Sequence, residues 1–230
     1  QIDAHLFVFV GEVGERAGEL LIQCLNSLEP AGIVYGRGRC NLAADRDFWD
    51  GERKQFVCGF NPDVPADDTV IVARVTADDG RVLASVVNYA CHPTTLAWDN
   101  TLISPDYVGA MREVVERETG AACLFLQGAC GELGPREGFV GDVEVADRNG
   151  RQLGYAALAA LEALPRAATR FCYIGPVVSG ATLGAWSHQP LPEQEMEAKA
   201  CWRLVRWCEP LKYRPGQPTM AETRAELEKC

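Results

Sequence analysis

The chain has 230 residues and a mass of 25.1 kDa, enough for one large domain or two small ones. It is 47% hydrophobic and 23% charged, a globular composition that excludes a disordered chain, a coiled coil and a collagen-like fibre. The net charge of −10, without any basic run, argues against nucleic-acid binding. The longest apolar stretch, residues 82–91, is shorter than the ~18 residues of a membrane helix.

The two ends of the sequence suggest a piece of a longer protein. The chain begins at Gln1 and stops at Cys230 inside a helical-looking segment. A secretion signal therefore remains open, because the natural N-terminus is expected to lie upstream.

The first half of the chain predicts one helix, three strands and a long loop. Apolar residues recur at helical spacing over 13–28, although LFVFV at 6–10 also fits a short strand and leaves the helix start open. A loop of this length is often functional in a compact domain. In chain order the predicted elements are a helix at 13–28, a strand at 33–40, a loop at 41–66, and a hairpin of strands 69–76 and 82–90 around the turn 78–81.

The second half alternates helices with strands. A helix is expected to begin with Ser104 as N-cap and Pro105 as first helical residue. The continuous apolar run at 122–128 is typical of a strand covered on both faces. This alternation predicts an α/β layered domain with a mixed β-sheet flanked by helices. The predicted elements are helices at 105–118, 143–164, 192–209 and 219–230, and strands at 122–128 and 170–178.

The ten cysteines are interpreted as free thiols, mostly buried in apolar runs. None forms a C-x-x-C pair, which excludes a zinc ribbon or a redox motif of that type. A chain this rich in core residues does not need a disulfide framework. Free thiols favour a reducing, cytoplasmic compartment, while a secreted protein stays open for the reason given above.

His92 is the first candidate functional residue. It follows a predicted strand in NYACHP, and Pro93 directs the chain out of that strand. Residues at the carboxyl ends of strands in α/β sheets face the ligand crevice, where a rigid imidazole suits metal ligation. The alternative is a histidine that is hydrogen-bonded in the core.

A glycine-rich segment is the second candidate. LFLQGACGELGP, residues 124–135, takes an apolar strand straight into spaced glycines. Glycines let the backbone approach a ligand, and backbone N–H groups then serve as oxyanion donors. The segment lacks the ending of a P-loop. A tight turn without function explains it equally well.

Two charged positions complete the set. Asp106 falls in the first turn of a predicted helix, where capping and the helix dipole explain it without any function. Arg46 lies between two acidic residues in the long loop. It is either solvated surface charge or an arginine that clamps substrate.

The order of these motifs resembles the neutral, non-lysosomal ceramidase family. His-Pro after a strand, then LISPDY at 102–107, then an apolar strand into Gln-[small]-x-x-Gly-[acidic]-x-x-Pro follow the family's succession. The similarity runs from about residue 67 to residue 147, and Asp45-Arg46 extends it upstream. It implies that 1–180 is part of a ceramidase-like α/β catalytic domain, with 181–230 as a helical continuation.

The resemblance also implies a zinc-dependent hydrolase that cleaves the amide bond of an N-acyl sphingolipid. His92 matches one zinc-binding histidine of the family. The family's His-x-His motif is not matched by His5, and its late glutamate and tyrosine ligands find no counterpart before the last residue. Arg46 and Glu132 match residues implied to be catalytic. The motif positions Gln127, Gly128 and Gly134 are implied to bind substrate.

Gly134 departs from the family pattern. At the matching position the family has a serine, to which a nucleophile-like role is assigned, whereas this chain has glycine. We therefore expect metal-activated water to attack a lipid or small-molecule amide. The alternative is a ceramidase-like domain that has no catalytic activity and acts as a binding or structural domain. The sequence does not specify the acyl substrate or the oligomeric state.

Overall fold

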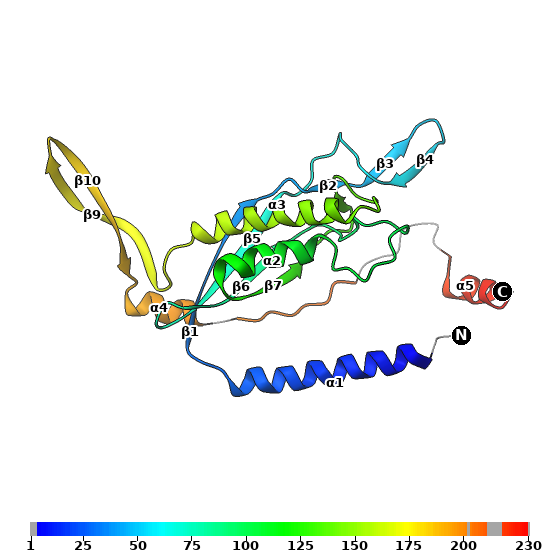
Figure 1. Cartoon of the computed structure of the whole chain (residues 1–230). Coiled ribbons are helices and arrows are strands. Elements are labelled where there is room, and N and C mark those ends of the chain that lie inside the picture. The colour runs from blue at the N-terminus through cyan, green and yellow to red at the C-terminus, as the bar shows by residue number, and fades with distance from the viewer. Residues whose placement is uncertain (1–3, 202, 211–217, 230) are drawn as a thin grey trace. The chain divides into compact units, whose positions relative to one another are not determined.

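The computed structural model describes residues 4–201, 203–210 and 218–229. By internal contacts the chain divides into two units, residues 1–191 and residues 192–230. The first unit contains a four-stranded mixed sheet in the order β1-β5-β6-β7, which confirms the predicted fold class (Figure 1). The strands are β1 (Ala31–Arg39), β5 (Thr69–Ala77), β6 (Val82–Tyr89) and β7 (Ala122–Gln127).

The strand directions follow from the connections. β1, β5 and β6 are antiparallel neighbours, and β5 and β6 form the predicted hairpin. β7 is parallel to β6, because the chain crosses back through α2 (Tyr107–Thr119). β6 is thus an interior strand, and its carboxyl end lies beside that of β7.

Two helices cover one face of the sheet. α3 (Val143–Glu162) packs on β1 and β5, and α2 packs on β6 and β7. The residues beneath them form the core, which includes Val70, Val72, Val87 and Cys123. A Cβ on Gly36 or Gly38 would lie within 3 Å of α3 side chains, so these glycines let the helix approach β1 closely.

The other face of the sheet carries exposed apolar side chains, which we call the open sheet face. One cross-strand row of it consists of Tyr35, Ala73, Val86 and Leu124. Tyr35 is 73% exposed and Leu124 57%. The prediction that the strand at 122–128 is covered on both faces was therefore wrong within the described residues, because both packed helices lie on one side.

The long loop predicted at 41–66 contains three short strands: β2 (Ala43–Asp45), β3 (Asp47–Asp50) and β4 (Gln55–Cys58). β3 and β4 form a small hairpin. β2 pairs with β8 (Leu133–Pro135), a strand inside the glycine-rich segment. β2 has no periodicity of its own, because its pairing with a distant segment rather than a local pattern produces it.

The structure settles the start of one helix and corrects that of another. α1 (Ala4–Asn26) includes LFVFV, so the start that the sequence left open lies well before residue 13. α2 begins at Tyr107 with Asp106 as N-cap, whereas Ser104 and Pro105 precede the cap. The Ser104 hydroxyl instead accepts a hydrogen bond from the Asp106 backbone N–H, at 3.0 Å.

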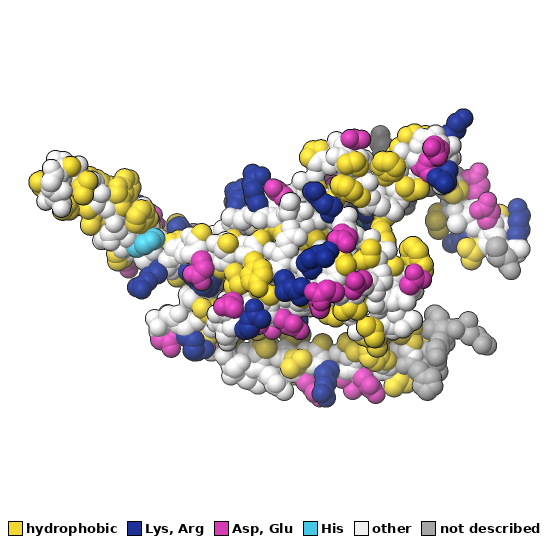
Figure 2. Space-filling view, turned by 45° about the horizontal axis from the view of Figure 1, so that its top comes forward, with side chains coloured by type: hydrophobic (Ala, Val, Ile, Leu, Met, Phe, Trp, Pro, Cys, Tyr) yellow, Lys and Arg dark blue, Asp and Glu magenta, His cyan; other side chains and the backbone are white. Residues whose placement is uncertain are grey.

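Residues 169–190 form a two-stranded hairpin of β9 (Thr169–Ser179) and β10 (Ala181–Pro190). Residues 181–190, expected in a helical continuation, are therefore a strand, because they pair along their whole length with β9. Exposed aromatic and aliphatic side chains line the hairpin (Figure 2). The sequence between Phe171 and Ser187 has no charged residue.

The second unit contains two short helices. α4 (Glu193–Ala200) covers only the first part of the helix predicted at 192–209, and residues 203–210 have no regular structure. α5 (Met220–Leu227) agrees with the start of the last predicted helix and begins with a capping box of Thr219 and Glu222.

The nine described cysteines are all free thiols, as predicted. Four of them are buried: Cys40, Cys91, Cys123 and Cys130. Most of the others are exposed, so the prediction that the cysteines are mostly buried is correct only for these four. Cys230 lies outside the described residues. None of the described helices has the length and apolar character needed to cross a membrane.

Candidate functional site

Three segments that are distant in the sequence meet at the carboxyl ends of β6 and β7. They are the loop 91–96 after β6, the segment 128–135 after β7, and β2 with Arg46. The antiparallel pairing of β2 and β8 places Ala44 opposite Gly134 and Asp45 opposite Leu133. The sheet therefore brings most of the predicted site residues together at the carboxyl ends of β6 and β7.

His92 lies three residues beyond the end of β6 and is held by Leu133. Its backbone N–H donates to the Leu133 carbonyl at 2.9 Å, and its ring Nδ1 lies 3.1 Å from the same oxygen. A carbonyl oxygen only accepts, so this ring contact is a hydrogen bond when Nδ1 carries the proton. The lone pair of Nε2 is then available to a ligand, which is the usual arrangement in metal-binding histidines.

Arg46 is attached to the same strand. Its backbone N–H donates to the Glu132 carbonyl at 2.9 Å, and its own carbonyl accepts from the Gly59 N–H at 2.7 Å. Within the described part of the chain its guanidinium forms no ion pair. Its Nε is buried and has no hydrogen-bond partner there. Arg46 is thus not the solvated surface charge of the alternative interpretation.

Gly134 is buried between Arg46 and Thr94. A Cβ on Gly134 would lie 3.8 Å from Arg46 Cδ and 3.8 Å from Thr94 Oγ1, both ordinary contact distances. The hydroxyl of Thr94 is also buried without a partner among the described residues. Sequence reasoning passed over Thr94, although its position directly after His92-Pro93 was a usable signal.

Two buried tyrosines hold the loops that bear these residues. The Tyr89 hydroxyl donates to the Cys40 carbonyl at 2.7 Å and accepts from the Ala43 N–H at 2.8 Å, fixing the start of β2. The Tyr107 hydroxyl donates to the Cys91 carbonyl at 2.6 Å, next to His92. Burial raises the pKa of both phenols well above the usual range, so both hydroxyls stay protonated donors.

Asp106 links α2 to the loop after β6. Its carboxylate accepts from the Tyr107 N–H at 2.7 Å and from the Leu96 N–H at 2.9 Å. It is buried, with a φ of 53°, a conformation that needs support from surrounding contacts. Asp106 is thus the N-cap itself and not a first-turn residue, and its second hydrogen bond, to the Leu96 N–H, adds a tertiary role.

The remaining predicted residues lie around this centre with different surroundings. The Gln127 side chain donates to the Cys91 carbonyl at 2.7 Å. A Cβ on Gly128 would lie 3.0 Å from the Ala90 backbone, so the close approach here is between two protein segments. Glu132 is exposed, and only its backbone carbonyl contacts Arg46. Their catalytic or substrate-binding roles stay predictions.

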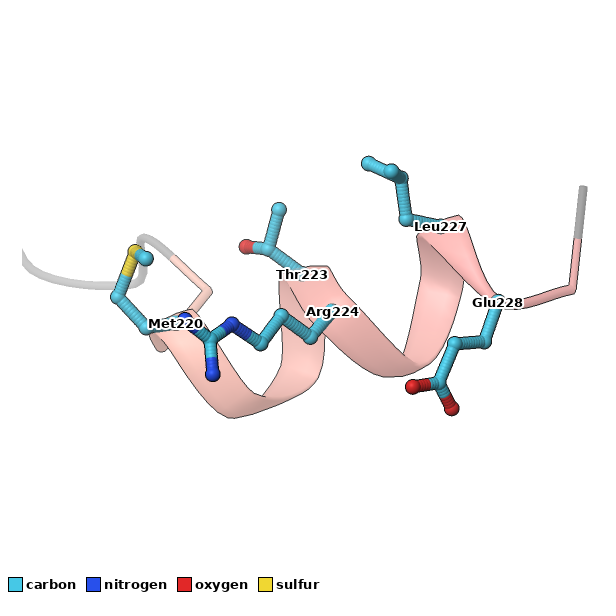
Figure 3. A pocket seen from close by; sticks show the side chains of 5 residues that line it. All are labelled: Met220, Thr223, Arg224, Leu227 and Glu228. Atoms are coloured by element: carbon cyan, nitrogen blue, oxygen red, sulfur yellow. The ribbon is translucent and has the colours of Figure 1, made fainter.

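The described residues do not form a complete metal site. No group of three or more His, Cys, Asp or Glu side chains lies close enough together there to hold an ion. One hollow of about 410 Å³ follows the flank of the short helix α5 (Figure 3), and another of about 380 Å³ follows α1. Neither includes His92, Arg46 or Gly134.

Comparison with known proteins finds structural neighbours only. No protein-family model matches the sequence, and no curated protein matches it. The crystal structure of neutral ceramidase from Pseudomonas aeruginosa has a TM-score of 0.50 and 19% identity. The similarity covers 71% of this chain and 30% of that chain. A ceramidase complexed with C2 matches over 68% of this chain and 28% of its own, with 19% identity and a TM-score of 0.48.

The Pseudomonas aeruginosa structure, with its TM-score of 0.50, supports a ceramidase-like fold for the region that it covers. The chain spans about 30% of the length of the first neighbour. The fold agrees with the resemblance drawn from the sequence motifs.

Proposed function

We propose that this chain is part of the catalytic region of a zinc-dependent amide hydrolase related to neutral ceramidases. The observation that carries the proposal is the Nδ1 contact of His92 with the Leu133 carbonyl, which leaves Nε2 to a metal. The substrate class is an N-acyl sphingolipid or a related amide, by analogy with the fold.

In this proposal His92 is one zinc ligand. In this proposal the remaining zinc ligands lie outside the described residues. When bound, zinc would supply Lewis acidity and an acidified water molecule. Arg46, whose Nε has no protein partner, would donate to the oxygen of the scissile carbonyl as negative charge develops there.

The test is metal analysis and amide hydrolysis with the full-length protein. Wild type is expected to bind about one zinc ion and to hydrolyse short- and long-chain N-acyl substrates. His92→Ala should lose the zinc, since loss of a ligand costs more than the 10–100-fold typical of its supporting groups. His188→Ala is the matched control, because His188 is exposed on the β9–β10 hairpin, where its ring lies tilted against that of Phe171.

Equal zinc contents in wild type and His92→Ala would contradict the assignment of the ligand. Turnover that persists in chelator would contradict zinc dependence.

A second function is a ceramidase-like domain that binds without catalysis. Two observations favour it: Gly134 stands where the family has a serine, and the described residues lack a cluster of metal ligands. This function predicts no turnover in wild type, and turnover that appears only in Gly134→Ser would support loss of an ancestral activity.

A further inference from the structure

The peptide bond between Cys91 and His92 is held by three different elements. Its carbonyl, that of Cys91, accepts from the Tyr107 hydroxyl at 2.6 Å and from the Gln127 Nε2 at 2.7 Å. Its N–H, that of His92, donates to the Leu133 carbonyl at 2.9 Å. A carbonyl oxygen has two lone pairs and an amide has one proton, so every hydrogen-bonding position of this peptide unit is occupied. Its plane is therefore fixed jointly by α2, β7 and β8.

The side-chain amide of Gln127 uses both of its N–H groups within the protein. A carbonyl oxygen only accepts, so the amide nitrogen and not the amide oxygen faces the Cys91 carbonyl. The same nitrogen donates to Cys130 Sγ at 2.8 Å. An amide nitrogen carries two hydrogens, so Gln127 has no N–H left for an oxygen of a substrate. This arrangement favours a supporting role for Gln127 over donation to substrate.

The two contacts of Gln127 join the two segments that meet at His92. Cys130 lies in the glycine-rich segment, and its carbonyl accepts from the Leu133 N–H at 2.9 Å. The Leu133 carbonyl in turn holds both the backbone N–H and the ring Nδ1 of His92. These contacts form a closed chain that returns to the Cys91 carbonyl. A shift of His92 relative to Leu133 would therefore disturb several hydrogen bonds together.

Tyr107 can lose its hydroxyl without losing its packing. Its side chain is fully buried, and its ring lies edge-on to that of Phe125, with 6.2 Å between the ring centroids. Its backbone N–H is bonded to the Asp106 carboxylate. Since neither contact uses the hydroxyl, Tyr107→Phe removes the bond to the Cys91 carbonyl and leaves the rest of the residue in place.

We propose that Tyr107 and Gln127 are positioning residues for His92. Acting through the Cys91 carbonyl, they hold the imidazole with Nδ1–H on the Leu133 carbonyl, so that Nε2 is presented to a ligand. The resemblance to ceramidases assigns no role to Tyr107, and for Gln127 it implies substrate binding instead. The identity of the ligand as zinc rests on the proposed function, whereas the orientation of the ring does not.

The first test is NMR of the two His92 ring nitrogens in isotopically labelled full-length protein without zinc. It is recorded at about pH 8, where an ordinary imidazole is neutral and the nitrogen shifts distinguish its two tautomers. Wild type is expected to hold the Nδ1–H tautomer. Tyr107→Phe removes one donor, and Gln127→Met removes the other at similar side-chain length. Each variant should show a mixture in which the Nε2–H tautomer is populated.

Two matched controls separate positioning from general support of the fold. Tyr89 is as deeply buried as Tyr107, but its hydroxyl holds the start of β2. Tyr89→Phe should lower the melting temperature and leave the His92 tautomer unchanged. Gln152→Met is the control for the amide, because the Gln152 side chain bonds to Asn41 on the surface.

Zinc affinity is the second readout. Tyr107→Phe and Gln127→Met should each weaken zinc binding about 10-fold to 100-fold, the range for groups that support a metal ligand. The two control variants should bind zinc as wild type does.

Three results would overturn the proposal: the Nε2–H tautomer in wild type, wild-type nitrogen shifts in both variants, or an equal change of tautomer in Tyr89→Phe. If Tyr107→Phe does not fold, Gln127→Met decides alone, because Gln127 is not buried. A wild type that binds no zinc, but whose Nδ1–H tautomer is lost in the variants, would contradict the hydrolase proposal and support this one.

Discussion

His92 and Arg46 are positioned by two consecutive carbonyl groups, those of Leu133 and Glu132. Both contacts use the backbone of the residues just before Gly134, so the identities of those two side chains matter less than the path of the chain. The glycines of this segment do not share one role. Gly128 is required by close packing, whereas a Cβ on Gly134 would make only ordinary contacts with Arg46 and Thr94.

Gly128→Ala should lower the free energy of unfolding by roughly 1–3 kcal/mol, since the added Cβ would press on the Ala90 backbone at 3.0 Å. Urea unfolding of the two proteins measures this difference. Gly131→Ala, with nothing within 4 Å, should change stability much less. Equal effects of the two substitutions would show that the packing at Ala90 relaxes.

The buried thiols should resist alkylation. Burial raises the pKa of Cys91 to about 12 and that of Cys123 to about 11, so both remain protonated and inaccessible at pH 8. Iodoacetamide should label the exposed Cys58 and Cys208 in the native protein, and Cys91 and Cys123 only in denaturant. Peptide mass spectrometry reads each site, and rapid native labelling of Cys91 would contradict its burial.

The same pKa values give a pH dependence of stability. These thiols ionise more readily when unfolded, near pH 8.5, so the folded state holds more protons above that pH. Stability should be constant below about pH 8 and fall as pH rises toward 11–12. Thermal melting at pH 7 to 11 checks this, with Cys91→Ala expected to reduce the slope.

At the scale of elements, α2 and α3 determine where the site forms. α2 returns the chain from β6 to β7 in parallel, which brings the two carboxyl strand ends together. Its N-terminus then holds the loop after β6 through the Asp106 carboxylate and the Tyr107 hydroxyl. α3 supports α2 at short distance, because a Cβ on Gly150 would lie 2.3 Å from the Tyr107 carbonyl.

Gly150→Ala should therefore be strongly destabilising, by roughly 2 kcal/mol or more, despite the higher helix propensity of alanine. It should also displace Tyr107 and weaken zinc binding at His92. Gly14→Ala in the exposed helix α1 is the matched control, expected to be neutral or stabilising by roughly 0.5–1 kcal/mol. A melting temperature for Gly150→Ala equal to that of wild type would contradict the close helix packing.

At the scale of the whole molecule, helices cover only one face of the four-stranded sheet within the described residues. The open sheet face exposes five large apolar side chains: Ile33, Tyr35, Ile71, Leu124 and Leu126. A contiguous exposed apolar patch is uncommon on the surface of a monomeric globular protein. The neutral ceramidase structure with a TM-score of 0.50 is more than three times as long as the region of it that matches.

The 230-residue chain by itself is therefore expected to bind a hydrophobic dye such as ANS and to self-associate. The double variant Tyr35→Glu/Leu124→Lys should reduce both, because it places charges in one cross-strand row of the open sheet face. Tyr155→Lys, a change of an exposed residue on α3, is the control. Dye fluorescence and light scattering measure the effects, and a monomer without dye binding would contradict the exposure of this face.

The sequence by itself determined the main strands, the α2–β7 crossover, the long helix α3 and the candidate residues His92 and Arg46, because hydrophobic periodicity and strand-end motifs are local signals. The tertiary structure alone decided that β2 pairs with β8, that Asp106 rather than Ser104 caps α2, and that residues 181–190 form a strand. It also brought Thr94, Arg46 and Gly134 together. The β2–β8 pairing and the grouping around Gly134 depend on contacts between segments distant in the sequence. The cap of α2 depends on competition between neighbouring residues, and strand β10 depends on its pairing with β9, so local patterns carry no record of these features.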